Sequence, residues 1–436
     1  MKRNLLILIT VSSLCSTLFA GSTLRLKIEP ERDYLLSGSK AELVLKIDLV
    51  AAAVRGKHSR TPLNLAVALD RSGSMTGAKI EKARQAAMLV VDQLSPEDYF
   101  SIIIYSDHAE VLLPAQRVED KERLKRQIGR ISVAGSTALY AGVKAAAEQV
   151  EKHLSSHRIN RVLLLSDGLA NVGPSSPAEL RRLGGTLSER GIAVTTIGVG
   201  DDYNEVLMAG LAEASDANYY YVQDTEKLPQ IFAKELGELL TVAARQVRIE
   251  IICPAGIRPI GLIGRQERFE GQRAVVRLEH FTPLQDRYLF LRCRAEQDSP
   301  EIATVNVTYI DELNQGAEET MKEVARIKFT RDPAQANQSS RPEVVAHKEL
   351  FLTALAKDDA LAEADAGRYR QAAEKLSNQA GLLEAQYENA PASMRQQLRQ
   401  EVDNLRLRSS QLQQNQYDSR MRKSIDNESW QYRNSK

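Results

Sequence analysis

The chain has 436 residues, of which 43% are hydrophobic and 26% are charged, a composition typical of a globular protein with about two or three domains. Its 58 Lys and Arg residues nearly balance its 57 Asp and Glu residues, and a net charge of only +1 does not favour binding to nucleic acid or to an anionic membrane. Three cysteines are too few for a disulfide-rich scaffold or a four-thiolate zinc site.

Residues 1–22 have the pattern of a signal peptide, with a basic start, an apolar stretch at 5–20 and small residues after it. The stretch has about 16 residues, whereas a spanning helix needs about 20, and no later segment is long and apolar enough to cross a bilayer. We therefore expect an exported protein in the periplasm or outside the cell. Anchoring by an uncleaved N-terminal segment is the alternative.

Two regions, residues 23–60 and 245–331, alternate apolar and polar residues with the period of half-buried strands. Neither region alone is large enough for a sandwich, so we expect one β-sandwich built from early strands in the first and late strands in the second. Cys253 and Cys293 lie in strand-like runs of the second region. An oxidising compartment would permit a disulfide between them, and two separately buried thiols are the alternative.

Residues 61–244 alternate short, continuous apolar runs with segments of helical period. Runs such as 65–69, 100–104 and 162–165 are typical of strands that are buried on both faces. Strands of this kind between helices predict an α/β fold with a doubly wound, mostly parallel sheet. Because the two ends of such a domain commonly lie close together, it can be inserted in the sandwich.

The C-terminal part is rich in Ala, Glu, Gln, Leu and Arg. Helical periodicity over residues 342–413 predicts an α-helical region with three helices, at roughly 343–365, 368–388 and 392–413. The last helix has apolar residues spaced four, four and three apart, a narrow seam suited to a partner helix, so self-association through these helices is one expectation. Residues 414–436 are polar, and we expect a disordered tail there.

Oxygen-bearing side chains follow the predicted strands of the α/β domain. The first strand ends in Asp70, and Ser72 and Ser74 alternate with it, so a turning backbone can aim all three at one point. Thr137 opens a later helix, and Asp167 follows another buried strand. Ligands of open α/β sheets bind outside the carboxyl ends of the strands. Carboxylate and hydroxyl oxygens are hard ligands that suit Mg²⁺ or Ca²⁺ and disfavour zinc.

This pattern resembles the metal-ion-dependent adhesion site of the von Willebrand factor type A (VWA) domain. That family has Asp-x-Ser-x-Ser on a first loop, Thr on a second and Asp, usually followed by Gly, on a third, and nothing is missing here. The resemblance implies that Ser72 and Ser74 bind Mg²⁺ (or Ca²⁺) directly, that Thr137 binds directly or through water, and that the two carboxylates act mostly through waters. A cation held mainly by neutral hydroxyls stays under-neutralised, so its open position is expected to accept a carboxylate from a partner protein.

A VWA domain followed by a β region is similar to bacterial proteins labelled calcium-activated chloride channel homologues and to inter-alpha-trypsin inhibitor heavy chains. The channel label does not transfer, because no spanning segment follows the leader. We expect a metal-dependent protein-binding module of the cell envelope that serves adhesion or assembly. The contrasting hypotheses are an envelope scaffold, in which the metal is structural and the helical tail mediates assembly, and a regulator of a membrane complex.

Enzymatic alternatives fit the residues less well. A phosphoryl-transfer enzyme with Asp70 as nucleophile would want a second carboxylate two residues later, where Ser72 stands. A serine hydrolase would need a Gly-x-Ser-x-Gly elbow, which is missing at Ser72 and Ser74. No phosphate loop or dinucleotide fingerprint follows any predicted strand. The sequence therefore predicts binding and no catalysis.

Overall fold

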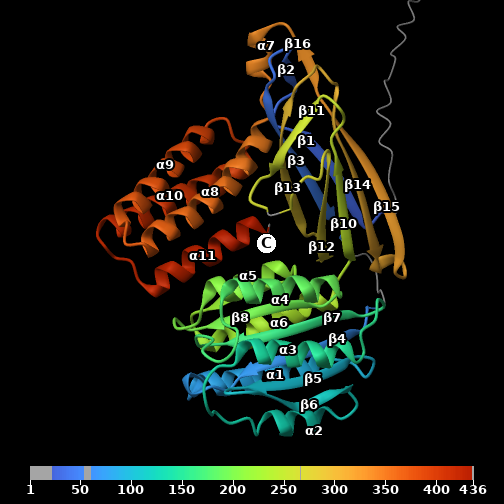
Figure 1. Cartoon of the computed structure of the whole chain (residues 1–436), viewed down its shortest axis with the longest axis vertical. Coiled ribbons are helices and arrows are strands. Elements are labelled where there is room, and N and C mark those ends of the chain that lie inside the picture. The colour runs from blue at the N-terminus through green and yellow to red at the C-terminus, as the bar shows by residue number, and fades with distance from the viewer. Residues whose placement is uncertain (1–21, 54–59, 266, 435–436) are drawn as a thin grey trace, which may run out of the picture.

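The computed structural model describes residues 22–53, 60–265 and 267–434. The predicted signal peptide therefore lies, except for Ser22, outside the described residues. Figure 1 shows three parts: an α/β domain, a β-sandwich and a group of helices that lies beside both. Within the described ranges, no helix combines the length and the hydropathy needed to cross a membrane.

The α/β domain is built on a six-stranded sheet. Its strands are β4 (Leu63–Asp70), β5 (Tyr99–Tyr105), β6 (Ala109–Arg117), β7 (Ile159–Ser166), β8 (Ala193–Val199) and β9 (Tyr219–Val222). They lie in the order β6-β5-β4-β7-β8-β9, and only β6 is antiparallel to its neighbour. Every residue of β4 and β7 is buried, because helices cover both faces of a parallel sheet.

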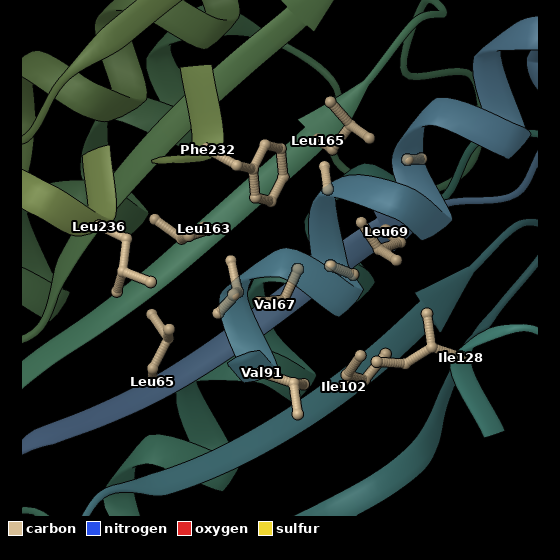
Figure 2. Packing of buried hydrophobic residues seen from close by; sticks show 14 of the residues in the cluster. Leu65, Val67, Leu69, Val91, Ile102, Ile128, Leu163, Leu165, Phe232 and Leu236 are labelled. Carbon is tan, nitrogen blue, oxygen red and sulfur yellow. The ribbon is translucent and has the colours of Figure 1, made fainter. Parts of the chain in front are cut away.

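Helices and two short 3-10 turns connect these strands. They are η1 (Gly73–Met75), α1 (Ala78–Gln93), α2 (Lys121–Ile128), α3 (Leu139–Glu151), α4 (Pro177–Glu189), α5 (Glu205–Ala214), η2 (Thr225–Lys227) and α6 (Leu228–Leu240). Figure 2 shows Val67 of β4 in the cluster that joins Val91 of α1 and Phe232 of α6 to the sheet. Ala66 and Ala68 point to the opposite face, where their small side chains let α3 approach closely.

Strands from before and after the α/β domain form the β-sandwich. They are β1 (Leu24–Pro30), β3 (Glu42–Ala51), β10 (Ala244–Ile252), β11 (Ile257–Leu262), β12 (Arg273–Phe281), β13 (Asp286–Ala295), β14 (Glu301–Asp311) and β15 (Ala317–Arg326). One sheet has the order β1-β3-β13-β11 and the other β12-β10-β14-β15. Because β3 pairs with β13, the α/β domain is inserted between strands of one sandwich, and the predicted fold class is confirmed.

Two short parallel strands and a short helix complete one end of the sandwich: β2 (Tyr34–Leu36), β16 (Lys328–Thr330) and α7 (Pro333–Gln338). A 3-10 turn, η3 (Glu312–Asn314), joins β14 to β15 at the other end, where the Glu312 amide donates to the Ala243 carbonyl at 2.9 Å.

Cys253 and Cys293 are two buried free thiols in the sandwich core and do not form the disulfide that the sequence allowed. Burial raises the pKa of the Cys253 thiol to about 12 and also raises that of Cys293, so neither thiol readily forms the thiolate that starts disulfide exchange.

The helical region consists of α8 (Pro342–Asp365), α9 (Tyr369–Tyr387) and α10 (Ala392–Gln413), whose bounds agree closely with the three predicted helices. The apolar seam of α10 is buried against α9 of the same chain, and its residues are Met394, Leu398, Val402 and Leu405. The seam is therefore covered within the chain, and it is not the free surface that self-association through it would need.

The prediction of a disordered tail at residues 414–436 is wrong, because this segment contains the helix α11 (Ser419–Arg433). Figure 1 shows α11 between the other C-terminal helices and the α/β domain. Trp430 is 2% exposed and packs edge-on against Tyr219 of β9. Lys423 donates to the Tyr203 carbonyl and pairs with Glu205 of α5 at 2.6 Å. Three buried apolar residues, Met421, Ile425 and Trp430, hold this helix together with ion pairs, so a mostly polar segment is packed as an ordered helix.

Candidate metal centre

The predicted site residues lie on three loops at the carboxyl edge of the six-stranded sheet. Asp70 is the last residue of β4, Asp167 follows β7, and Thr137 stands just before α3. Hydrogen bonds between backbones join the first loop to the second: the Gly73 amide donates to the Gly135 carbonyl at 3.0 Å, and the Ala134 amide to the Arg71 carbonyl at 2.7 Å. The crossover topology therefore brings together residues that are far apart in the sequence.

A chain of hydrogen bonds links the first loop to the third. Asp70 Oδ1 accepts from the Ser72 amide at 2.8 Å, and the Ser72 and Ser74 hydroxyls lie 3.0 Å apart. The Ser74 hydroxyl donates to Asp167 Oδ1 at 2.7 Å. The other oxygen of Asp70 accepts from Ser166 at 2.8 Å, so both carboxylates are oriented by neighbours of fixed position.

Thr137 from the second loop completes the group. A Cβ on Gly168 would lie 3.3 Å from the Ser74 hydroxyl and 3.3 Å from the Thr137 hydroxyl, so both oxygens border the space that this glycine leaves open. The Thr137 amide donates to Asn171 Oδ1 at 2.8 Å, which holds the second loop against the third. The structure therefore brings all five predicted site residues together.

The second loop depends on a glycine. Gly135 has φ +70°, a conformation that L side chains rarely adopt, and a Cβ there would lie only 2.3 Å from Asp107 Oδ2. The same carboxylate accepts from the Ser136 amide at 2.8 Å. Asp107, in the turn after β5, thus supports the turn that presents Thr137.

Burial dominates the electrostatics of the two carboxylates. Asp70 and Asp167 are both 0% exposed, whereas Ser74 is exposed and opens the group to solvent. Burial raises the pKa of Asp70 to about 6, with a smaller contribution from the nearby Asp167, although hydrogen bonds from Ser72 and Ser166 act in the opposite direction. A divalent cation beside them would offset the cost of ionising both carboxylates.

The donor set fits a hard cation. Oxygens on adjacent corners of a Mg²⁺ octahedron with bonds of about 2.1 Å are about 3.0 Å apart, and the Ser72 and Ser74 hydroxyls have that separation. In the described part of the chain no three His, Cys, Asp or Glu side chains form a group that could hold a metal ion. A metal centre at this edge would therefore depend on the hydroxyls.

Sequence reasoning missed four residues that shape the group: Lys79, Ser166, Gly168 and Asn171. Gly168 stood in the motif as the residue after the last aspartate, but only the structure shows that its missing side chain leaves open the space that two hydroxyls border. Lys79 is the most consequential, because its ammonium lies 2.5 Å from Asp167 Oδ2. No spacing rule predicts that contact.

Together these features define an open α/β domain whose loops present hydroxyl and carboxylate oxygens at the carboxyl edge of a parallel sheet. Residues 64–234 match the family model of the von Willebrand factor type A domain, and the chain therefore contains a VWA domain.

Curated relatives match over part of their length. The chain is 29% identical to the uncharacterized protein YfbK of Escherichia coli (strain K12) over 55% of this chain and 41% of that protein. It is 26% identical to the uncharacterized protein sll0103 of Synechocystis sp. over 60% of this chain and 65% of that protein. It is also 29% identical to the inter-alpha-trypsin inhibitor heavy chain H3 of Rattus norvegicus, over 35% of this chain and 18% of that protein. The chain thus spans less than two thirds of each of these relatives.

Two solved structures share most of the fold. A von Willebrand factor type A protein from Catenulispora acidiphila has a TM-score of 0.70 at 17% identity, over 86% of this chain and 89% of that chain. The ArnB paralog VWA2 from Sulfolobus acidocaldarius has a TM-score of 0.61 at 18% identity, over 90% and 98%. Both similarities extend beyond the α/β domain, so the added β-sheets and C-terminal helices are part of the shared architecture.

Proposed function

We propose that this protein is a divalent-metal-dependent protein-binding module, in which a metal-ion-dependent adhesion site accepts a carboxylate from a partner protein. The convergence of the Ser74 and Thr137 hydroxyls with Asp167 beside Gly168 carries this proposal. VWA domains generally mediate protein–protein interaction or adhesion, which supports binding as the role of this edge.

The residues would divide the work by their chemistry. Ser72, Ser74 and Thr137 would hold Mg²⁺ (or Ca²⁺) through neutral hydroxyl oxygens, and the cation would supply an electrophilic position for the partner's carboxylate. The Ser74 hydroxyl donates a hydrogen bond to Asp167, so its oxygen keeps lone-pair capacity for a cation. The two buried carboxylates, Asp70 and Asp167, would supply the negative charge that attracts the cation.

A cation titration tests the proposal. We expect the wild-type protein to bind Mg²⁺ or Ca²⁺ in calorimetry, and the double variant Ser72→Ala with Ser74→Ala to lose that binding. Thr76→Ala is the matched control, because the Thr76 hydroxyl lies on the same loop but donates to the Gly73 carbonyl, away from the site. A wild-type protein that binds neither cation would contradict the proposal.

We also propose that the protein works in the cell envelope after export, with an acidic protein surface as its partner. A pull-down from an envelope extract with Mg²⁺ or with a chelator tests this role, and cell fractionation tests the location. Chelator-sensitive capture that the double serine variant loses would support adhesion.

The second candidate is an envelope scaffold, and the tight joint between α11 and the α/β domain favours it. If the double serine variant melted at a much lower temperature but still captured its partner, the metal would be structural and the helices would carry recognition. Stable co-purification with a membrane complex would point to the regulatory role.

A further inference from the structure

Lys79 brings a positive charge into the candidate metal centre from within the chain. It is the second residue of α1, and its ammonium pairs with Asp167 Oδ2 at 2.5 Å. Asp167 is 0% exposed, and its other oxygen already accepts from Ser74. One oxygen of Asp167 therefore pairs with the lysine, and the other accepts the hydrogen bond from Ser74 in the site.

The lysine is held in this place. A Cβ on Gly200 would lie 3.6 Å from the Lys79 ammonium nitrogen and 3.7 Å from its last methylene carbon, so the end of the side chain rests on the turn after β8. Its side chain is 24% exposed, and its exchange with bulk water is therefore restricted. Lys79 thus spans from α1 to the third site loop and the turn after β8.

The charged side chains at the centre do not fully neutralise a bound divalent cation. Asp70 and Asp167 supply two negative charges, and the positive charge of Lys79 offsets one, so the three side chains together carry a net charge of −1. A divalent cation held there leaves a net positive charge, whereas without the lysine the carboxylates alone would neutralise it. The lysine repels the metal but raises the gain from a further negative ligand.

We propose, resting on the proposed function, that Lys79 is an internal counter-cation that weakens metal binding in the free protein and couples it to binding of the partner's carboxylate. In this view Lys79 is a positioning residue: it contacts Asp167 and acts through it. Metal and carboxylate then bind cooperatively, each raising the affinity for the other by the same factor.

The experiment compares Lys79→Met and Lys79→Arg with the wild-type protein. Lys82→Met is the matched control, because Lys82 lies nearly one turn further along α1 and pairs with the exposed Glu226, away from the site. We expect Lys79→Met to bind Mn²⁺ and Mg²⁺ about tenfold more tightly, the effect of removing a unit charge at short range. Lys79→Arg and Lys82→Met should stay close to wild type.

Thermal unfolding in a chelator separates this role from a merely structural one. Lys79→Met leaves the buried Asp167 carboxylate without its cation, so its metal-free melting temperature should fall while its metal affinity rises. If the lysine only positioned Asp167, both quantities would fall together. Equal or weaker metal affinity in Lys79→Met, with Lys79→Arg folded as a reference, overturns the proposal.

Acetate serves as the carboxylate probe for the coupling. At constant ionic strength, acetate should raise the Mn²⁺ affinity of the wild-type protein by a larger factor than that of Lys79→Met. Equal factors would overturn the coupling. A wild-type protein that binds no cation would defeat the proposed function itself, an outcome distinct from unchanged affinity in Lys79→Met.

Discussion

Two regions of this protein bury charge, and they do so in opposite ways. Around α11, a buried lysine meets two partners of opposite sign: Lys357 is 1% exposed and lies 2.7 Å from Glu401 and 2.8 Å from Glu428. At the carboxyl edge of the sheet, Asp70 is fully buried, and among the described residues only neutral groups of Ser72 and Ser166 donate to it. Lys357 and Arg408 thus balance Glu401 and Glu428 within the chain, whereas the described residues give Asp70 no cationic hydrogen-bond donor.

The pKa values of Glu428 and Asp70 follow this difference. Burial alone would raise the pKa of Glu428, but Lys357, Asn404 and Arg408 outweigh it and hold the pKa below the ordinary value. At Asp70 burial is stronger than the hydrogen bonds, and the pKa rises to about 6. A buried group with an unmet charge is a candidate for ligand binding, and one with a matched charge is a candidate for structural support.

The largest expected effect is at Lys357. Lys357→Met leaves the buried Glu401 without its cation and leaves Glu428 with Arg408 alone, so we expect a loss of about 3–5 kcal/mol in the free energy of unfolding. Urea unfolding measures it. Lys375→Met is the control, because its partner Glu363 lies 3.8 Å away and Lys375 is 40% exposed, and it should cost less than about 1 kcal/mol. Similar losses in both variants would break the comparison.

The apolar anchor of the same joint comes next. Trp430→Ala should cost about 3 kcal/mol, because it empties the space that the indole fills against Tyr219. Limited proteolysis should then cut near α11 before it cuts the α/β domain. Protection of α11 equal to that in the wild type would mean that its ion pairs suffice without the tryptophan.

At the candidate metal site, removing a charge should stabilise the metal-free protein. The difference between a pKa of about 6 for buried Asp70 and its ordinary value of 3.8 means that the ionised carboxylate lowers the free energy of unfolding by about 3 kcal/mol at neutral pH. Asp70→Asn removes the charge and keeps an acceptor for the Ser72 amide. We therefore expect the variant to be about 2 kcal/mol more stable in a chelator, yet to gain no stability from Mg²⁺. Destabilisation in the chelator would show that the carboxylate is satisfied without metal.

The pH dependence is the smallest and most specific test. Because the metal-free folded state binds a proton at Asp70 more readily than the unfolded chain, this group stabilises the metal-free protein at about pH 4 and loses that contribution as the pH rises through about 6. Mg²⁺ requires the ionised form, so its affinity should fall by up to tenfold per pH unit below about 6. Calorimetry at several pH values measures it, and a flat profile between pH 5 and 7 would contradict the assignment.

Much of the fold could be predicted because its signals are local. Runs of buried residues such as Leu65 to Leu69 predict a strand covered on both faces, and proline and glycine mark the ends of the C-terminal helices. The prediction for the tail is wrong because α11 has only a sparse apolar face, Met421, Ile425 and Trp430, among mostly polar residues. Its stability comes from Trp430 and from Lys423 with Glu205, which meet only after the chain has folded.

By itself the sequence determined the alternation of strands and helices in the α/β domain and its insertion in the sandwich, because residue type and spacing carry this information. They also singled out the five candidate site residues Asp70, Ser72, Ser74, Thr137 and Asp167. Only the tertiary structure decided that Gly168 leaves open the space beside two hydroxyls, that α9 covers the seam of α10, and that Lys79 shares Asp167 with the site. The reason is physical: contacts between distant segments depend on how helices and loops pack, and the chain order does not state those distances.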